Sequence, residues 1–192
     1  TMLNMVADVI GIIKALGYEN AITVGHDWGG PIALNTAALH PDVITATGTL
    51  SVPYTSRGPM STLDLWKEIY KDRFFYQLYF QKEGVAEAEF ENDLERALRI
   101  TYTNSDGRGM AKGIEKSQSG LNPQKGPDAT FLEGMEEFEE LPGWLTQADI
   151  DYFVSQFEIG GLRGPLNRYR AQNLDWEQLE GLPKTISQPA FF

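Results

Sequence analysis

The chain has 192 residues, 42% of them hydrophobic, and this length can bury one sizeable core or a core with a subdomain. Its formal net charge of -11 argues against nucleic acid or an anionic membrane as a partner, because both select basic patches, and leaves neutral or apolar small molecules as ligands. With no cysteine and two histidines, the sequence excludes disulfides, thiol chemistry and histidine-rich metal cages, so we expect no metal and no cofactor.

The first 53 residues alternate between helical and strand patterns. Apolar residues at helical spacing predict a helix over residues 1–16, with Gly17 as its stop. The next predicted elements are a strand over 21–25, a helix over 30–40 and a strand over 43–53. This order is typical of an α/β fold with a parallel sheet.

The following part of the chain is mostly helical, with glycine and proline between the segments. Helical spacing predicts helices within residues 61–80, 84–102 and 146–159. The last of these has Thr146 as a candidate N-cap, with Asp149 in the capping-box position where Glu or Gln is preferred. Residues 104–143 are polar and glycine-rich, so we expect loops and at most one short helix.

The predicted organisation is a core of residues 1–53, a helical cap over 54–183, and the start of the next core strand at 184–192, where "ISQPAFF" is typical of a buried strand. Both ends look cut, and we interpret the chain as an internal segment of a longer protein. No stretch approaches the roughly 20 apolar residues of a membrane span, and the first residues do not resemble a signal peptide. We therefore expect a cytoplasmic location.

The stretch "VGHDWGG", residues 24–30, lies between a predicted strand and a predicted helix. It contains G-x-D-x-G, the nucleophile-elbow pattern with Asp27 in the serine position. In such a turn the glycines two positions to either side let the chain pass without clashing Cβ atoms, and the strained central residue projects at the carboxyl end of the sheet. The helix N-terminus that follows favours the ionised carboxylate.

An ionised Asp27 needs no base to activate it and attacks carbon to form an ester, which suits alkyl electrophiles. The alternative is that Asp27 only caps the next helix, since a lone G-x-D-x-G is weak evidence. The strand before it, the helix after it and the double glycine favour the nucleophile. His26 points away on such a turn and is interpreted as a packing or hydrogen-bonding residue, and His40 as a helix-end residue.

With these residues in view, the sequence resembles the soluble epoxide hydrolases of the α/β-hydrolase fold. The resemblance rests on "GHDWGG", "YQLYFQKEGVAEAEFENDL" and "GGLRGPLNRYR". It implies an α/β-hydrolase core with an inserted helical cap, and an epoxide substrate whose oxygen is held by two cap tyrosines, Tyr76 and Tyr169. It also implies an oxyanion-hole N–H at Trp28. We further expect Trp28, Pro31 and Tyr54 to line the substrate pocket. A homodimer is expected to form through the cap.

Two tyrosines suit this chemistry because opening an epoxide leaves an alkoxide, which must be protonated as the carbon–oxygen bond breaks. A phenol with a pKa of about 10 is protonated at neutral pH and still able to donate. Composition alone would make Tyr76 and Tyr169 ordinary core residues, and only the flanking motifs favour the catalytic role. Tyr79, one turn from Tyr76, is the competing choice of register.

The resemblance also implies a histidine with an acidic partner beyond the cap, and an HGxP-type loop ahead of the first helix, neither of which occurs in these 192 residues. Two other functions stay open. A haloalkane or haloacid dehalogenase uses the same Asp elbow, but has no use for a facing tyrosine pair, so Tyr169 discriminates. A non-catalytic binding or signalling relative could keep the same fold.

Overall fold

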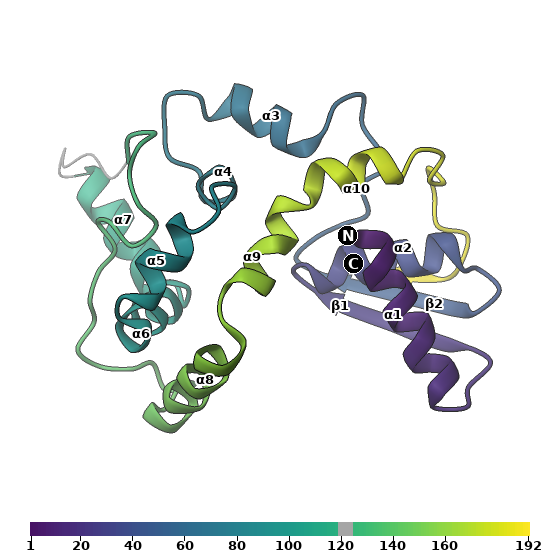
Figure 1. The fold of residues 1–192 in the computed structure, drawn as a ribbon, viewed down its shortest axis with the longest axis horizontal. Helices are drawn as coiled ribbons and strands as arrows, with labels where there is room; N and C mark the ends of the chain where they lie inside the picture. Colours follow the sequence, from purple (N-terminus) through teal and green to yellow (C-terminus); the bar gives the residue numbers. More distant parts are fainter. Residues whose placement is uncertain (119–124) are drawn as a thin grey trace. The chain divides into compact units, whose positions relative to one another are not determined.

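The computed structural model describes residues 1–118 and 125–192 and contains two compact units (Figure 1). The first, which we call the sheet unit, comprises Thr1–Thr62 and Ala171–Phe192, and the second, the cap unit, comprises Leu63–Arg170. The sequence analysis placed residues 171–183 in the cap. In the structure they join the sheet unit because the helix at Gln172–Gln178 packs against the N-terminal helix.

The sheet unit has the alternating order predicted from the sequence. Its elements are α1 (Met2–Ala15), β1 (Ala21–His26), α2 (Gly29–Leu39), β2 (Ile44–Leu50), α10 (Gln172–Gln178) and β3 (Ala190–Phe191). The strands form a parallel sheet in the order β1-β2-β3. The last strand is much shorter than the predicted 186–192 because Pro189 has no N–H to donate: its carbonyl accepts from Thr47 at 3.0 Å, and the ladder begins with the next residue.

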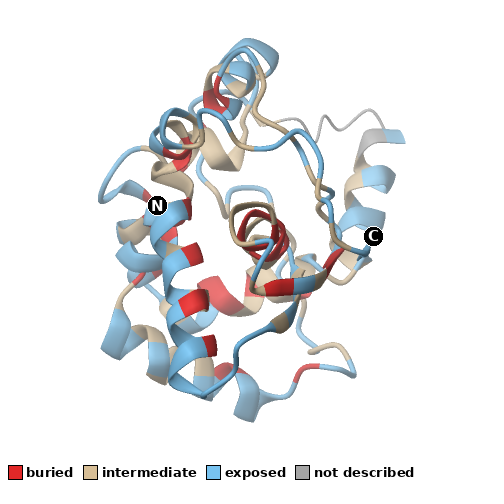
Figure 2. Cartoon of the chain, turned by 90° about the vertical axis from the view of Figure 1, so that its right-hand side faces the viewer, coloured by how far each residue is buried: buried red, intermediate tan, exposed pale blue. Residues whose placement is uncertain are grey.

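Helix α1 buries one side, as its spacing predicted. In Figure 2 its buried positions recur along one side of the helix. Ile10 and Ile13 of that side pack with Ala37 of α2 and Ile44 of β2. The helix ends as predicted, because Gly17 has φ +80° and so turns the chain where an L side chain would be strained.

The two faces of strand β1 differ. Its residues alternate between half-buried and exposed, and α2 packs against both β1 and β2. The exposed positions include the apolar Ile22 and Val24, whose side chains are 65% and 58% exposed. The described sheet therefore presents an apolar stripe on β1 that no described residue covers.

The cap unit is helical, as predicted. Its elements are α3 (Thr62–Ile69), α4 (Tyr76–Tyr79), α5 (Val85–Glu91), α6 (Leu94–Asn104), α7 (Arg108–Gln118), α8 (Gln147–Gly160) and α9 (Arg163–Arg170). The expectation of loops and at most one short helix over 104–143 agrees with the described residues, where α7 is the helix that begins and ends there; residues 119–124 lie outside them. None of the helices in the described ranges is both long and apolar enough to cross a membrane.

Two predicted helices are interrupted in the structure. The pattern over 61–80 divides into α3 and α4, and the pattern over 84–102 divides into α5 and α6. At the second break Asp93 leaves the helical conformation and its side chain accepts from the backbone N–H of Arg96 at 3.1 Å, which caps α6. The predicted capping box of Thr146 and Asp149 is confirmed at the start of α8.

Candidate active site

The predicted elbow has the expected strand-turn-helix form. Strand β1 ends at His26, helix α2 begins at Gly29, and Asp27 between them has φ +49°. A non-glycine residue with positive φ stores local strain of the kind found at functional sites. The side chain of Asp27 is exposed and makes no hydrogen bond to any described residue, so its carboxylate does not cap α2.

The close approaches at the elbow occur at Gly25 and Gly30 and not at Gly29. A Cβ at Gly25 would lie 2.6 Å from the backbone nitrogen of Gly30, and closer still to the carbonyl of Gly29, so the strand and helix can pass only if this residue is glycine. A Cβ at Gly29 would meet nothing within 4 Å, so the expectation that both flanking glycines relieve a clash is wrong for Gly29. The second close contact is instead at Gly30, where a Cβ would overlap the hydroxyl of Thr49.

The residues expected beside Asp27 lie in the same unit. Trp28 is the N-cap of α2, and Pro31 in the first turn of that helix accepts at its carbonyl from the Asn35 amide at 2.7 Å. The hydroxyl of Tyr54 donates to the carbonyl of Pro183, and burial raises the pKa of Tyr54. The hydroxyl of Tyr54 is therefore engaged within the sheet unit.

The two histidines have different outcomes. His40 ends α2, where its N–H donates to the carbonyl of Thr36 at 2.9 Å, as its position predicted. The side chain of His26 is exposed and bonds to no described residue, so its role in packing or hydrogen bonding stays a prediction. Strand alternation explains this, since His26 falls on the exposed side of β1.

The structure brings the two predicted cap tyrosines together. Tyr76 begins α4 and Tyr169 lies in α9, and their rings meet edge to face with centroids 5.8 Å apart and planes at 81°. Phe80 contacts both rings, with its ring centroid 5.7 Å from that of Tyr76 and 5.0 Å from that of Tyr169. Edge-to-face contacts of this kind hold aromatic rings in defined orientations.

An apolar cavity of about 330 Å³ lies against this pair. Its lining residues are Tyr76, Phe80, Phe90, Thr101, Phe131, Phe157, Leu162, Pro165, Leu166 and Tyr169. Four residues of this lining also belong to the buried core of the cap unit: Phe80, Phe90, Leu162 and Leu166. A cavity with apolar walls and few hydroxyls is the type of site that receives a small apolar ligand.

Tyr79 has a different environment from Tyr76. Its hydroxyl donates to Oε2 of Glu89 at 2.8 Å, and the same carboxylate accepts the backbone N–H groups of Phe131 and Leu132 at 3.0 Å each. Burial, together with the hydrogen bond and charge of Glu89, raises the pKa of Tyr79 well above its ordinary value. Because this hydroxyl is bonded to Glu89, the geometry favours Tyr76 as the partner of Tyr169.

Sequence analysis missed two glutamines beside the pair. The amide of Gln77 donates to the phenol oxygen of Tyr76 at 2.9 Å, which leaves the phenol hydrogen for another acceptor. The amide of Gln81 donates to the carbonyl of Gln77 at 2.7 Å and to the carbonyl of Tyr169 at 3.2 Å. Both glutamines occur in "YQLYFQ", but a contact between positions 81 and 169 has no signal in the sequence.

Comparison with known proteins decides the family. A family model described as the alpha/beta hydrolase fold matches residues 1–184. The chain belongs to this family. Strands β1 and β2 therefore belong to the sheet of a hydrolase fold, and Asp27 lies in the turn between β1 and α2.

Epoxide hydrolases are among the proteins that the chain resembles. The chain is 34% identical over 189 residues to epoxide hydrolase A of Mycobacterium tuberculosis. The aligned region covers 98% of this chain and 57% of that protein. It is 31% identical to the bifunctional epoxide hydrolase 2 of Rattus norvegicus, over 95% of the chain and 31% of the relative. The chain thus spans about half or less of the length of these curated relatives.

Solved structures give the same result. The crystal structure of epoxide hydrolase A from Mycobacterium thermoresistibile matches with a TM-score of 0.86 and 34% identity, over 99% of this chain and 58% of that one. An epoxide hydrolase from an endophytic Streptomyces matches with a TM-score of 0.86 and 43% identity, over 99% and 56%. The described hydrolase fold, cap helices included, is therefore shared with proteins of that name.

Proposed function

We propose that the full-length protein hydrolyses epoxides to vicinal diols through a covalent ester on Asp27. The observation that carries the proposal is the edge-to-face pair of Tyr76 and Tyr169 on the wall of an apolar cavity. The exposed Asp27 carboxylate at positive φ and the names of the relatives support it. The whole reaction is assigned to the full-length protein, because the chain covers only part of each relative.

In the first step a carboxylate oxygen of Asp27 attacks a carbon of the epoxide, and the carbon–oxygen bond of the ring breaks toward the ring oxygen. Tyr76 or Tyr169 donates its phenol proton to that oxygen while the other tyrosine hydrogen-bonds to it, which avoids a free alkoxide. Water then attacks the carbonyl carbon of the ester. The backbone N–H of Trp28 is proposed to bind the oxyanion. The bond between the carbonyl carbon and the diol oxygen then breaks, and that oxygen takes one proton of the attacking water. The second proton goes to solvent, from which the phenolate has regained its own, so the Asp27 carboxylate and the tyrosine are both restored.

The second candidate is a dehalogenase that uses the same Asp27. A departing halide needs donors that stabilise an anion and leaves no oxygen to protonate, so a facing pair of phenols is not required. The position of Tyr169 against Tyr76 favours the epoxide. A non-catalytic relative would have no use for a strained acidic residue at the elbow, whose backbone conformation costs about 1–3 kcal/mol.

The proposed substrate is a small apolar epoxide. The cavity wall beside the tyrosines is built from phenylalanine, leucine and proline side chains, with Thr101 as the non-aromatic polar residue in the lining. Such a wall binds a hydrocarbon substituent by burial of apolar area, at roughly 25 cal/mol per Å². A charged substituent there would lose its hydration without compensation.

Isotope labelling tests the mechanism directly. A single turnover of the full-length protein with styrene oxide in heavy-oxygen water should place the label in the peptide around Asp27, because water attacks the ester carbonyl. Asp27→Ala should abolish diol formation and labelling together. Label that enters only the diol would show direct attack by water on the epoxide and would refute the ester.

A cytoplasmic location and a homodimer through the cap are also proposed. The cysteine-free composition is compatible with a reducing compartment. Helix α8 of the cap unit leaves Tyr152 and Ile159 exposed, and these could contribute to a contact between two caps. Cell fractionation tests the first proposal, and light scattering of the purified protein tests the second.

A further inference from the structure

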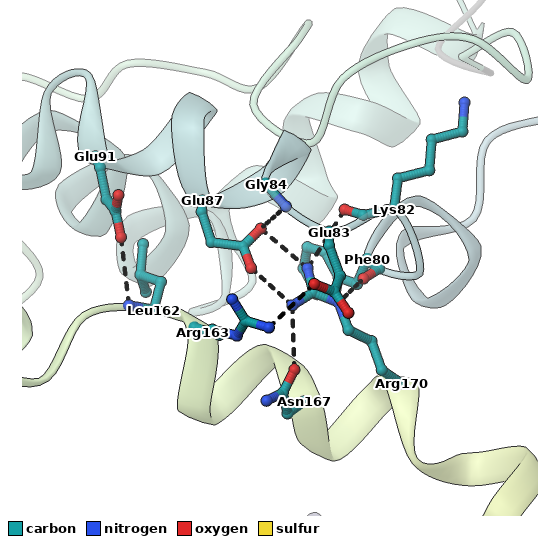
Figure 3. A network of polar contacts seen from close by, with 10 residues as sticks. All are labelled: Phe80, Lys82, Glu83, Gly84, Glu87, Glu91, Leu162, Arg163, Asn167 and Arg170. Carbon is teal, nitrogen blue, oxygen red and sulfur yellow. Dashed lines mark hydrogen bonds and ion pairs between the residues drawn. The ribbon is translucent and has the colours of Figure 1, made fainter.

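Three glutamates spaced four residues apart contact the segment that carries Tyr169 (Figure 3). The spacing places them on one side of α5 and of the turn before it. The contacts are Glu83 with Arg163, Glu87 with Arg170, and Glu91 with the backbone N–H of Leu162. The first two are ion pairs between the same two segments, so they can be compared directly.

The middle pair is partly buried, whereas the first is exposed. The side chains of Arg170 and Glu87 are 10% and 12% exposed, compared with 72% and 65% for Arg163 and Glu83. Nη1 of Arg170 lies 2.6 Å from Oε1 of Glu87, and Nη2 lies 2.9 Å from Oε2. This is the bidentate geometry in which a guanidinium fixes direction as well as distance.

The same guanidinium also bonds to the backbone beside the other tyrosine. Nε of Arg170 donates to the carbonyl of Phe80 at 2.8 Å, and Nη2 donates to the carbonyl of Lys82 at 3.3 Å. Phe80 is the C-cap of α4, the one-turn helix that begins at Tyr76. Arg170 follows Tyr169 in the chain, so a single side chain joins the backbone segments of both tyrosines.

Glu87 is itself held in place. One of its oxygens accepts the backbone N–H of Gly84 at 2.9 Å, which ties the carboxylate to the start of α5. The hydrogen bond from Arg170 is the main cause that lowers the pKa of Glu87, so the carboxylate stays ionised at neutral pH. Gln81 supplies a second link between the segments through its bond to the carbonyl of Tyr169.

We propose that the Arg170–Glu87 ion pair is a positioning element that sets Tyr169 against Tyr76, with Gln81 as a weaker second link. An ion pair withdrawn from solvent adds little to stability compared with apolar residues of the same size. Its bidentate geometry does fix direction, and here it fixes the relative placement of the two phenols. The catalytic consequence rests on the proposed function. The structural consequence, the contact of the two rings, does not.

The effect should be confined to one chemical step. The tyrosines act when the epoxide opens, and hydrolysis of the ester does not use them. Glu87→Gln and Arg170→Lys should therefore slow ester formation from styrene oxide by about 10- to 100-fold, the cost of a misplacement on the order of 1 Å, while ester hydrolysis stays within about twofold. Rapid-quench single-turnover kinetics on the full-length protein separate the two steps.

The exposed pair provides the matched control. Glu83→Gln and Arg163→Lys make the same changes of charge and shape between the same segments, and should leave both rates unchanged. If Glu87 acts through Tyr169, then adding Glu87→Gln to Tyr169→Phe should cost almost nothing more. If Glu87→Gln slowed ester formation equally in the wild-type protein and in the Tyr169→Phe variant, the positioning role would be overturned.

A second readout does not depend on activity. With labelled tyrosine, the protein should show nuclear Overhauser contacts between the rings of Tyr76 and Tyr169, which Glu87→Gln weakens and Glu83→Gln preserves. Gln81→Met gives the same test if Glu87→Gln does not fold. Ring contacts that persist in Glu87→Gln and Gln81→Met would refute the inference. Loss of the contacts in a protein that forms no ester would support the inference and refute the proposed function.

Discussion

Tyr79 donates its hydroxyl hydrogen to the carboxylate of Glu89 at 2.8 Å, although it lies only one turn from Tyr76. The two tyrosines of "YQLYF" thus serve different purposes. Tyr79 helps to hold the loop that carries Phe131, which lines the cavity. Tyr76 meets the ring of Tyr169.

This difference predicts the kinetics of three phenylalanine variants of the full-length protein. Tyr76→Phe and Tyr169→Phe should each slow ester formation by about 10- to 1000-fold, and the double variant should nearly abolish it. Tyr79→Phe should change this rate little and destabilise the fold by about 1 kcal/mol, the usual value of one hydrogen bond. A Tyr79 variant slower than the Tyr76 variant would reverse the assignment.

The network around Glu89 predicts an acid-sensitive cap. Burial raises the pKa of the Glu89 carboxyl, but the hydrogen bonds that it accepts, first those from Thr130 and Leu132, outweigh burial and hold the pKa below its ordinary range. The unfolded chain then takes up the proton first on acidification. The stabilisation is present above the ordinary carboxyl pKa of about 4.3 and is lost as the pH falls through the folded value.

Denaturation of wild type and Glu89→Gln at a series of pH values checks this dependence. The variant should be less stable at neutral pH, and the difference in stability should shrink as the pH falls from the ordinary carboxyl pKa of about 4.3 through the lower folded value. Tyr79→Phe keeps the backbone hydrogen bonds to Glu89, so it should retain most of the loss of stability at acid pH that wild type shows. Parallel stability curves for wild type and Glu89→Gln would contradict the role of this carboxylate.

The elbow predicts a large loss of stability at one of its glycines, Gly25, and a small loss at another, Gly29. Gly25→Ala should destabilise the protein by about 2–4 kcal/mol, because its Cβ would overlap the backbone of Gly29 and Gly30, which cannot move without breaking α2. Gly29→Ala meets nothing and should cost less than about 1 kcal/mol. Chemical denaturation measures both. Similar losses at the two positions would mean that the close approach is not where the structure has it.

The exposed stripe on β1 predicts the behaviour of a polypeptide limited to these 192 residues. Because Ile22 and Val24 are exposed, this polypeptide should bind a hydrophobic dye and aggregate at low concentration. The double change of Ile22 and Val24 to Thr, a β-branched residue that suits a strand, should reduce both effects. The matched change Ile159→Thr, on exposed α8, controls for general hydrophobicity, and an equal benefit from it would refute a role for the stripe.

Sequence patterns predicted the sheet unit well because its elements are local. The spacing of α1, the turn glycines and the period of the strands all act over a few residues, and the elbow at Asp27 follows from them. The motif resemblance predicted the pairing of Tyr76 with Tyr169, which no spacing could give. The predicted role of Gly29 was wrong, because the sequence does not show which of the adjacent residues Gly29 and Gly30 lies against another part of the chain.

Contacts between distant residues could not be predicted. Three of the residues that bond to the Arg170 side chain, Glu87, Phe80 and Lys82, lie 83 or more positions away in the chain. Phe80 and Lys82 accept through backbone carbonyls, which any residue type could supply. The break between α5 and α6 was hidden because Asp93 caps a helix only when the chain leaves the helical conformation there. Such features depend on packing, which composition does not specify.

The backbone N–H of Met2 donates to Oδ1 of Asp175, a residue 173 positions later. During synthesis, α1 and the edge of β2 therefore leave the ribosome long before α10 and β3 exist. At roughly 5–20 residues per second, the wait is on the order of 10 seconds or longer. During this wait the nascent chain exposes an unpaired strand edge and an incomplete hydrophobic core. We therefore expect the yield of folded protein to depend on the concentration of chaperones in the cell.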